Sequence, residues 1–251
     1  MSFAVAAESY DRFMGRYSMP LAPRFLDFAR VDGGPVLDVG CGPGALTSAL
    51  VERFGEDAVA AADPSESFVA AARERHPGVR VELAAAEELP FDDGEFAAAM
   101  AQLVVHFMTD AVAGLREMAR VTREGGVVAA CVWDLASPAN PLGTVWQAAQ
   151  QLDPGLEGEA ERAGATEGHL GELFRAAGLR DVEDGVLSVE VRHDSFDEWW
   201  EPFTLGVGPS GQYVAGLDEA ARTALRDRCR ELLPSAPFTI AVRAWAARGI
   251  V

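Results

Sequence analysis

Apolar and polar positions alternate along the first 133 residues in a way that predicts strands and helices in turn. Five short apolar runs are bounded by turn residues, as strands are: 35–39, 57–62, 79–83, 95–101 and 127–133. Three intervening segments carry apolar residues at helical spacing: 45–54, 66–75 and 110–122. Strands that alternate with helices imply a parallel sheet with right-handed crossovers, so this half is predicted as an α/β fold.

The rest of the chain is less regular. Residues 8–29 carry aromatic and apolar side chains at helical spacing and are predicted as one or two helices, broken near Pro20. Beyond residue 133 the pattern favours helices over 142–151, 170–177, 195–203 and 218–232, and strands over 182–192 and 238–246. The glycines between 206 and 216 indicate a connector. No repeat or low-complexity linker divides the chain, so residues 1–251 are predicted as a single domain with insertions.

A glycine loop follows the first predicted strand and opens the next helix. It reads Asp38-Val39-Gly40-Cys41-Gly42-Pro43-Gly44. Glycines let the backbone approach a ligand closely and leave helix N–H groups pointing at it. The loop alone does not identify the ligand, because Gly40, Gly42 and Ala45 also satisfy the dinucleotide-binding fingerprint.

Asp63 narrows the choice to ligands that contain adenosine. It lies at the end of the second predicted strand, where an acid reaches the ribose hydroxyls. Nicotinamide, flavin and S-adenosylmethionine cofactors all call for such an acid. Asp38 favours the last of these, because a carboxylate there repels a pyrophosphate but suits the ammonium of a methionine moiety.

Composition excludes several other chemistries. The chain contains no lysine, which removes a pyridoxal Schiff base, a P-loop lysine and the Tyr/Lys pair of short-chain dehydrogenases. Its formal net charge of −18 works against nucleic acids and anionic membrane surfaces as partners. No membrane span is expected, and residues 1–11 lack the pattern of a signal peptide. Cys41, Cys131 and Cys229 are widely spaced, which fits reduced thiols in a cytoplasmic protein and no metal site.

Further blocks follow the glycine loop in a fixed order. They are Ala62-Asp63-Pro64-Ser65, Ala86-Glu87-Glu88-Leu89-Pro90-Phe91, Ala101-Gln102-Leu103-Val104-Val105-His106-Phe107 and Arg120-Val121-Thr122-Arg123-Glu124-Gly125-Gly126. Together the blocks resemble class I S-adenosylmethionine-dependent methyltransferases of the ubiquinone and menaquinone C-methyltransferase type, over residues 10–133. The resemblance implies a Rossmann-like, doubly wound, mostly parallel sheet of seven strands with the last strand antiparallel. It also implies S-adenosyl-L-methionine as the cofactor.

The resemblance assigns most of the cofactor-binding residues. Gly40, Cys41 and Gly42 line the methionine and ribose side, together with Asp38. Asp63 binds the ribose hydroxyls, and Gln102 lies beside the sulfonium. Pro64 and Phe68 flank the adenine, and Ala86 and Glu87 lie at its edge. Two positions depart from the family, Ala85 and Ala97, where relatives commonly have aspartate. Ala85 changes how the adenine amino group is recognised, since backbone groups at Ala86 and Glu87 must substitute.

The segment Tyr10-Asp11-Arg12-Phe13-Met14-Gly15-Arg16-Tyr17-Ser18 resembles the leading segment of small-molecule members of this group. That segment folds over the cofactor, which predicts residues 1–30 as a helical cover with Tyr10 and Met14 against the ligand. Arg16 is the candidate for binding the methionine carboxylate, since a guanidinium fits that geometry. A solvated surface charge is the alternative for Arg16.

The acceptor side is predicted from topology. His106 follows the fourth predicted strand, where acceptors approach in this fold, and is the candidate catalytic residue. A packed histidine is the alternative. Residues 134–165 and 195–234 are expected to form a helical lid over the acceptor pocket. Trp133, Trp199, Trp200 and Phe203 then predict an aromatic chamber, although residues at this spacing are also typical of a core.

The sequence therefore predicts a methyltransferase that acts on a small, hydrophobic or aromatic acceptor by in-line displacement. Two alternatives remain open. One is a nicotinamide- or flavin-binding oxidoreductase, and the other is a methyltransferase-like protein that binds the cofactor without catalysis.

Overall fold

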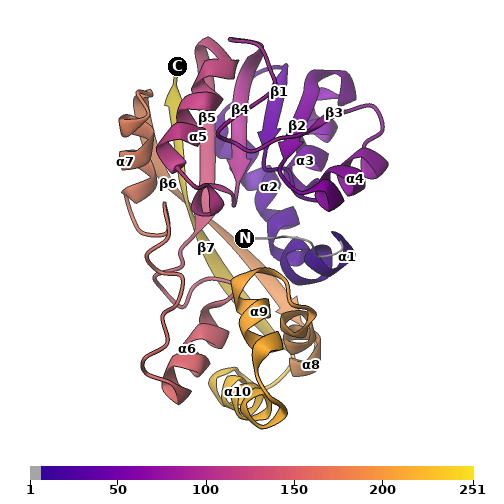
Figure 1. The fold of residues 1–251 in the computed structure, drawn as a ribbon, viewed down its shortest axis with the longest axis vertical. Coiled ribbons are helices and arrows are strands. Elements are labelled where there is room, and N and C mark those ends of the chain that lie inside the picture. Colours follow the sequence, from indigo (N-terminus) through magenta and orange to yellow (C-terminus); the bar gives the residue numbers. More distant parts are fainter. Residues whose placement is uncertain (1–6) are drawn as a thin grey trace.

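A seven-stranded sheet runs through the molecule in the order β3-β2-β1-β4-β5-β7-β6 (Figure 1). The structure is a computed structural model that describes residues 7–251, so residues 1–6 of the predicted cover lie outside it. The strands are β1 (Val36–Val39), β2 (Val59–Asp63), β3 (Arg80–Leu83), β4 (Phe96–Gln102), β5 (Thr122–Trp133), β6 (Arg180–His193) and β7 (Phe238–Ile250). β7 runs antiparallel to both neighbours and the other pairs are parallel. The predicted fold class is confirmed.

Helices connect the strands and extend the second half of the chain. They are α1 (Ala7–Tyr10), α2 (Arg16–Ala29), α3 (Ala45–Phe54), α4 (Glu66–Arg75), α5 (Ala111–Val121), α6 (Gly143–Leu152), α7 (His169–Ala176), α8 (Phe196–Trp200), α9 (Gly208–Gly216) and α10 (Glu219–Leu232). One π-helical turn, Asp11–Gly15, joins α1 to α2. None of these helices is long and apolar enough to cross a membrane.

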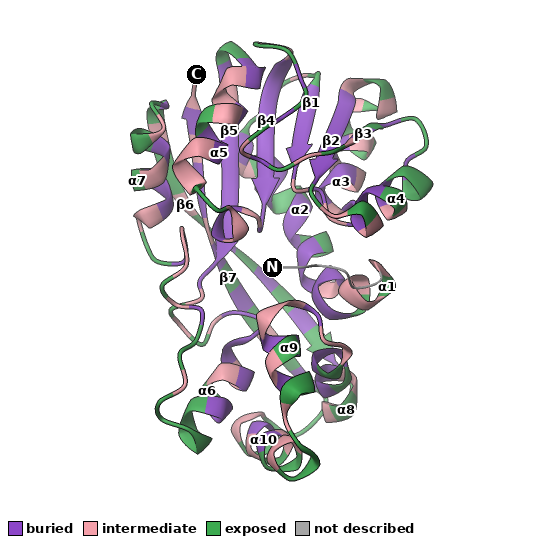
Figure 2. Ribbon diagram, in the orientation of Figure 1, coloured by how far each residue is buried: buried purple, intermediate pink, exposed green. Residues whose placement is uncertain are grey.

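Helices cover both faces of the sheet. Val36 and Ala98 face a core shared with α2, α3 and α4, whereas the neighbouring Leu37 and Ala99 face a core shared with α5 and α7. Successive side chains of a strand point to opposite faces, so a strand covered on both sides is buried throughout (Figure 2). This explains why the central strands are continuous apolar runs in the sequence.

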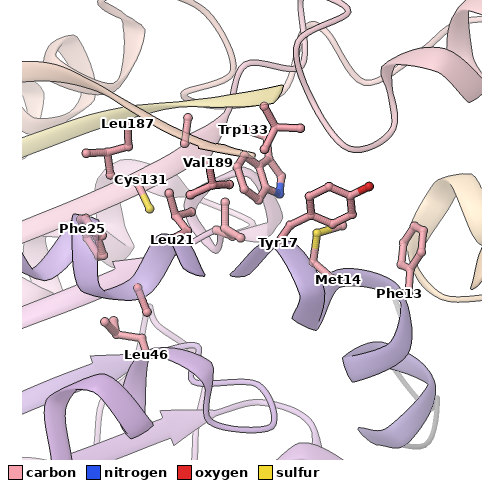
Figure 3. Packing of buried hydrophobic residues seen from close by; sticks show 14 of the residues in the cluster. Phe13, Met14, Tyr17, Leu21, Phe25, Leu46, Cys131, Trp133, Leu187 and Val189 are labelled. Carbon is pink, nitrogen blue, oxygen red and sulfur yellow. The ribbon is translucent and has the colours of Figure 1, made fainter. Parts of the chain in front are cut away.

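The helix break predicted near Pro20 is wrong. α2 continues through Pro20 and Pro23 and ends at Ala29. Its apolar face places Leu21 and Phe25 in the core with no exposed surface (Figure 3). Burying a large apolar side chain contributes about 1.5–3 kcal/mol, so several together outweigh the roughly 3 kcal/mol that an interior proline costs.

The connector predicted at residues 206–216 is also wrong, because most of it forms α9. Gly211 faces the backbone of Gly206, and a Cβ at position 211 would lie 3.0 Å from the Gly206 carbonyl carbon. Glycine at 211 therefore allows close packing of a helix against a turn, a use that sequence alone does not separate from flexibility.

β6 and β7 extend beyond the other strands and carry the helices of the second half. β7 pairs with β5 over residues 244–250, and residues 238–243 continue past the carboxyl end of β5 with β6 as partner. Figure 1 shows α6, α8, α9 and α10 gathered around this end. The extension thus places segments 134–165 and 195–234 beyond the carboxyl ends of the parallel strands, where ligands bind in open α/β sheets.

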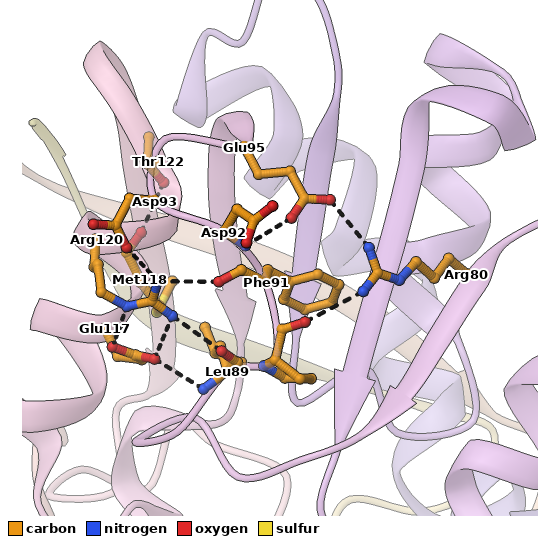
Figure 4. Close-up of polar contacts among 11 residues, drawn as sticks. Arg80, Leu89, Phe91, Asp92, Asp93, Glu95, Glu117, Met118, Arg120 and Thr122 are labelled. Atoms are coloured by element: carbon orange, nitrogen blue, oxygen red, sulfur yellow. Dashed lines mark hydrogen bonds and ion pairs between the residues drawn. The ribbon is translucent and has the colours of Figure 1, made fainter.

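Arg120, in the last turn of α5, fastens the loop between β3 and β4 (Figure 4). Its guanidinium donates to the carboxylates of Glu117 and Asp93 and to the carbonyls of Leu89 and Phe91, at 2.6–3.0 Å. Two of the sequence blocks, 86–91 and 120–126, therefore belong to one hydrogen-bond network.

Arg120→Ala is expected to lower the free energy of unfolding by about 2–3 kcal/mol, because it removes several hydrogen bonds to a charged group. Urea denaturation followed by circular dichroism measures the loss. Arg192→Ala is the matched control, since its pair with Asp194 is exposed and such pairs contribute about 0–1 kcal/mol. Equal losses in the two variants would contradict the role given to Arg120.

Candidate active site

The carboxyl end of β2 holds the glycine loop between β1 and α3. The amides of Gly40 and Cys41 donate to the Ala62 carbonyl at 2.7 and 3.0 Å, and the Gly42 amide donates to Asp63 Oδ2 at 2.9 Å. Gly40 and Gly42 have φ values of +71° and +53°, which lie in the left-handed region that glycine adopts without strain. The loop is therefore shaped by its glycines and tied to the neighbouring strand.

A cavity, called here the donor cavity, lies beside this loop at the carboxyl ends of β1 and β4. It is lined by Tyr10, Ser18, Asp38, Gly40, Cys41, Gly42, Pro43, Ala45, Leu46, Gln102 and Leu103. Three of these residues carry a buried oxygen without a hydrogen-bond partner among residues 7–251: Ser18 Oγ, Asp38 Oδ1 and Gln102 Oε1. All three oxygens accept hydrogen bonds, so the lining fits an ammonium group, which offers several N–H donors.

Asp38 supplies the charge of the donor cavity. Its Oδ2 accepts a hydrogen bond from Thr47 Oγ1 at 2.6 Å. Burial is the main cause that raises the pKa of Asp38 to about 7, and the negative charge of Asp63 also raises it. A cation in the cavity favours the ionised carboxylate, whereas a pyrophosphate is repelled by it.

The ribose and adenine side predicted by the sequence lies around Asp63. Asp63 Oδ1 accepts from the Ser65 amide at 2.8 Å, and burial raises the pKa of this carboxyl group. Tyr10 packs edge-on against Phe68 with ring centroids 5.2 Å apart, and the charge of Asp63 acts with burial to raise the pKa of Tyr10. Tyr10 of the N-terminal segment thus joins Phe68 to the donor cavity, which it lines, whereas Asp63 is outside that lining and Pro64 is exposed.

The two residues predicted at the adenine edge differ in their surroundings. Ala86 is buried in the core beneath α5. The Glu87 carboxylate accepts hydrogen bonds from the amides of Thr109 and Asp110 at 2.7 and 3.3 Å, just before α5 begins. The adenine-edge role of both residues stays a prediction.

A second cavity, called here the acceptor cavity, adjoins the first and has a volume of about 40 Å³. Its apolar lining includes Phe13, Met14, Phe107, Trp133, Leu135 and Val207. Tyr10 and Leu103 line both cavities and mark the boundary between them. Leu103 has φ +64°, a left-handed conformation that is strained for a leucine and is concentrated at functional sites.

Polar groups without partners interrupt the apolar lining of the acceptor cavity. His106 Nδ1, Trp133 Nε1 and Ser210 Oγ are buried, and within residues 7–251 none has a hydrogen-bond partner. Burial, together with the positive charge of Arg162, lowers the pKa of His106 to about 3. Its imidazole is therefore neutral at physiological pH.

The charges at the edge of the acceptor cavity neutralise each other. Glu159 lies in the lining and forms an ion pair with Arg162 at 3.0 Å. The same carboxylate accepts a hydrogen bond from Trp146 Nε1 at 3.1 Å. Burial raises the pKa of Glu159, and its three-way contact fixes the segment after α6 against the cavity.

Arg16 points away from the donor cavity. Its guanidinium donates to Glu198 Oε1 and to His193 Nδ1, each at 2.8 Å. Because a guanidinium only donates, His193 Nδ1 accepts, and its Nε2–H donates to the Tyr17 hydroxyl at 3.1 Å. Arg16 thus joins the N-terminal cover to β6 and α8, and its contact with a methionine carboxylate stays a prediction.

The predicted aromatic chamber is only partly assembled around the acceptor. Trp133 lines the acceptor cavity, but Trp199, Trp200 and Phe203 are buried behind it, in neither lining. Phe203 packs against Phe13 with ring centroids 5.0 Å apart, and Phe13 forms the wall. The core alternative therefore describes these three residues in the structure.

The sequence did not predict the polar residues Ser18, Glu159 and Ser210, or Leu103, as lining residues. Ser18 lies in phase with Leu21 on the apolar face of α2, and a polar residue in such a stripe is a signal that was available. Leu103, Glu159 and Ser210 reach the cavities through backbone strain or long-range packing, for which the sequence offers no local signal.

Comparisons with known proteins identify the family of this chain. A family model described as "Methyltransferase domain" matches residues 36–126. An uncharacterized methyltransferase of Mycobacterium tuberculosis strain H37Rv is 32% identical over 94% of this chain and 87% of its own length. A trans-aconitate 2-methyltransferase of Methylobacterium nodulans is 34% identical over 54% of this chain and 53% of its own length.

A solved structure has the same fold. A putative methyltransferase from Bacillus halodurans C-125 superposes with a TM-score of 0.59 at 16% identity, covering 91% of this chain and 97% of that chain.

The fold is Rossmann-like, and the unpartnered buried oxygens of the donor cavity fit a cationic ligand. The comparisons show that the chain belongs to the class I S-adenosylmethionine-dependent methyltransferases, so its cofactor is S-adenosylmethionine. The comparisons favour the methyltransferase over the oxidoreductase and non-catalytic alternatives. The finer likeness to ubiquinone and menaquinone C-methyltransferases stays a prediction.

Cofactor binding is expected to depend on the ionisation of Asp38. Its pKa is about 7 in the folded chain, against the ordinary 3.8, so the fold favours the protonated carboxyl group. The contribution of that group to the stability of the unliganded fold is therefore lost as the pH rises through 7. Ionised Asp38 attracts the cofactor ammonium, so the Kd of S-adenosylhomocysteine should fall about tenfold from pH 6 to pH 8. Calorimetry measures this, and Asp38→Asn should bind more weakly with little pH dependence. If the pH dependence of binding in Asp38→Asn equals that of the wild type, Asp38 is not the group that binds the cofactor ammonium.

Arg16→Ala is expected to weaken S-adenosylhomocysteine binding tenfold or more if its guanidinium takes the methionine carboxylate. Glu198→Gln serves as the matched variant, since it weakens the competing ion pair and leaves Arg16 in place. Calorimetric affinity that is unchanged in Arg16→Ala rules out the carboxylate role and leaves Arg16 as a structural link.

Proposed function

We propose that this methyltransferase modifies a small, neutral and largely apolar acceptor that carries an oxygen, such as a phenol or an enol. The observation that carries this proposal is the acceptor cavity. Its lining is mostly apolar and aromatic, and it contains three buried polar atoms without partners, on His106, Trp133 and Ser210. Buried polar atoms normally have partners, so these groups favour a ligand with a matching polar atom.

The hydrogen-bonding character of the three cavity groups indicates which polar atom the ligand carries. Trp133 Nε1–H only donates, so it needs an acceptor atom such as an oxygen, and the Ser210 hydroxyl both donates and accepts. A hydroxyl or carbonyl oxygen on the ligand satisfies these groups, whereas a purely apolar ligand leaves them unpaired.

The charge of the cavity supports a neutral acceptor. Arg162 is the cation near this lining, and Glu159 already pairs with it. The relative from Methylobacterium nodulans is named for trans-aconitate, a tricarboxylate. Anionic acceptors of that kind need cations that are free to bind them, so the present lining favours a different class.

The residues of this chain align the two reactants. Bound S-adenosylmethionine supplies a methyl group that is already activated by its sulfonium. Asp38 and Gln102 present acceptor oxygens to the charged end of the cofactor, and Tyr10 and Leu103 form the boundary where the acceptor must approach. The lid helices exclude water from this boundary, which favours in-line transfer between correctly oriented groups.

His106 is suited to orienting the acceptor. With a pKa of about 3 its neutral imidazole is a weak base, so removing a proton from a phenol is strongly uphill. A neutral imidazole still accepts a hydrogen bond from a hydroxyl. We therefore assign His106 the role of holding the nucleophile in line. As the methyl–sulfur bond breaks and the methyl–oxygen bond forms, the hydroxyl oxygen becomes positively charged and its proton then passes to His106 Nδ1 and on to water.

Incubation with S-adenosylmethionine and a panel of phenols and hydroxyquinones, read by mass spectrometry, tests the proposal. At least one phenol should gain a methyl group, and trans-aconitate should not. Trp133→Phe should then lower kcat/KM about tenfold or more, because it removes one buried hydrogen bond to the acceptor.

Trp199→Phe is the matched control for this loss. It also removes a buried, unpartnered indole N–H, but Trp199 lies outside both linings. Its kcat/KM should stay within about twofold of the wild type. Methylation of trans-aconitate alone, or equal losses in both variants, overturns the proposed acceptor class.

A further inference from the structure

A larger cleft continues from the acceptor cavity toward solvent. It has a volume of about 600 Å³ and lies between α6 and the segments on either side of it, 135–140 and 156–161. Leu135 and Glu159 line both this outer cleft and the acceptor cavity, so the two spaces meet at these residues. A molecule that occupies both must pass between them.

The acceptor cavity and the outer cleft differ in volume, so they suit different parts of a ligand. The acceptor cavity, at about 40 Å³, has room only for the small reacting end of a ligand. The outer cleft, at about 600 Å³, lies in the range of small-molecule sites, roughly 300–1,000 Å³. Trp133 Nε1 and Ser210 Oγ, both more than nine-tenths buried and without partners within residues 7–251, face the inner end. The reacting end of a ligand thus belongs inside and its body outside.

The polar lining of the outer cleft consists of carboxylates and neutral amides. Glu157 and Glu161 are exposed on one wall, and the amides of Gln147, Gln150 and Gln151 lie on the α6 wall. No arginine or histidine is among the described lining residues, and the chain has no lysine. The carboxylates accept hydrogen bonds and the glutamine amides both donate and accept them. Arg162 already pairs with Glu159 and Arg228 donates to Gln151, so the exposed Glu157 and Glu161 carry the charge that repels anions.

We propose that the outer cleft binds the body of the acceptor, and that this body is rich in hydroxyl or amine donors, as a sugar or amino sugar is. The proposal rests on the acceptor class proposed above, which concerns the reacting end alone. The acceptor is then a two-part molecule, with an apolar oxygen-bearing end joined to a polar, neutral or cationic body.

Three phenyl glycosides with one ring system and different charges test the proposal. They are 4-hydroxyphenyl β-D-glucopyranoside, its 2-amino-2-deoxy analogue and 4-hydroxyphenyl β-D-glucuronide, whose free phenolic hydroxyl stands for the reacting end, measured by ligand-observed NMR on the protein saturated with S-adenosylhomocysteine. The amino sugar should bind at least fivefold more tightly than the glucuronide at low ionic strength, with the neutral glucoside between them. Added salt should reduce the difference, because the carboxylates of the cleft are exposed.

The double variant Glu157→Gln/Glu161→Gln is the matched control, since it keeps the shape and removes the charge. The preference for the amino sugar over the glucuronide should fall below twofold in it. Gln147→Trp, which places a bulky side chain in the cleft, should weaken all three glycosides at least fivefold while phenol itself binds as in the wild type.

Each remaining outcome decides against the proposal. It is overturned by glycosides that do not bind, by equal affinities, by a preference for the glucuronide, or by a preference that persists in the double variant. Phenol reports on the reacting end separately, so failure of phenol to bind counts against the proposed function and not against the outer cleft.

Discussion

The hydrogen bonds from the glycine loop to the end of β2 are the interaction on which the site depends. The Ala62 carbonyl accepts two loop amides and the Asp63 carboxylate accepts a third. These bonds hold the left-handed backbone at Gly40 and Gly42, and so they place one wall of the donor cavity. Asp63 therefore has a structural task before any ribose reaches it, and its second oxygen is held by the Ser65 amide.

The N-terminal cover joins the two halves of the molecule above this loop. Asp11 pairs with Arg75 of α4, whereas Arg12 pairs with Glu201 beside the lid helices. Tyr10 stands just before these pairs and lines both cavities. The glycine loop of the sheet half thus lines the donor cavity, the extension of β6 and β7 carries α6, α8, α9 and α10, and Tyr10 lies at the boundary between the two cavities.

The sequence predicted correctly those helices whose ends are fixed by residues next to them in the chain. Ala45–Phe54 and Glu66–Arg75 are helices with the predicted bounds, because the glycine loop and the Asp63-Pro64-Ser65 turn determine where each begins. Pro20 misled the prediction because burial against the sheet outweighs the loss of one hydrogen bond. Long-range packing decides which aromatic residues line a cavity. Trp133 does so while Trp199 does not, and nothing in their neighbouring sequence separates the two.

The two cavities differ in charge, and we therefore expect them to recognise the two reactants in different ways. In the donor cavity, Asp38 offers an ionisable carboxylate to a cationic ligand, so charge selects the donor. In the acceptor cavity, the Glu159–Arg162 pair cancels and His106 is neutral, so under the proposed function shape and a few hydrogen bonds select the reacting end of the acceptor. A neutral acceptor cavity keeps anions from competing near the sulfonium, where an opposite charge is most attractive. Under this proposal, discrimination between acceptors by charge is left to groups farther out, where solvent weakens each charge and several must act together.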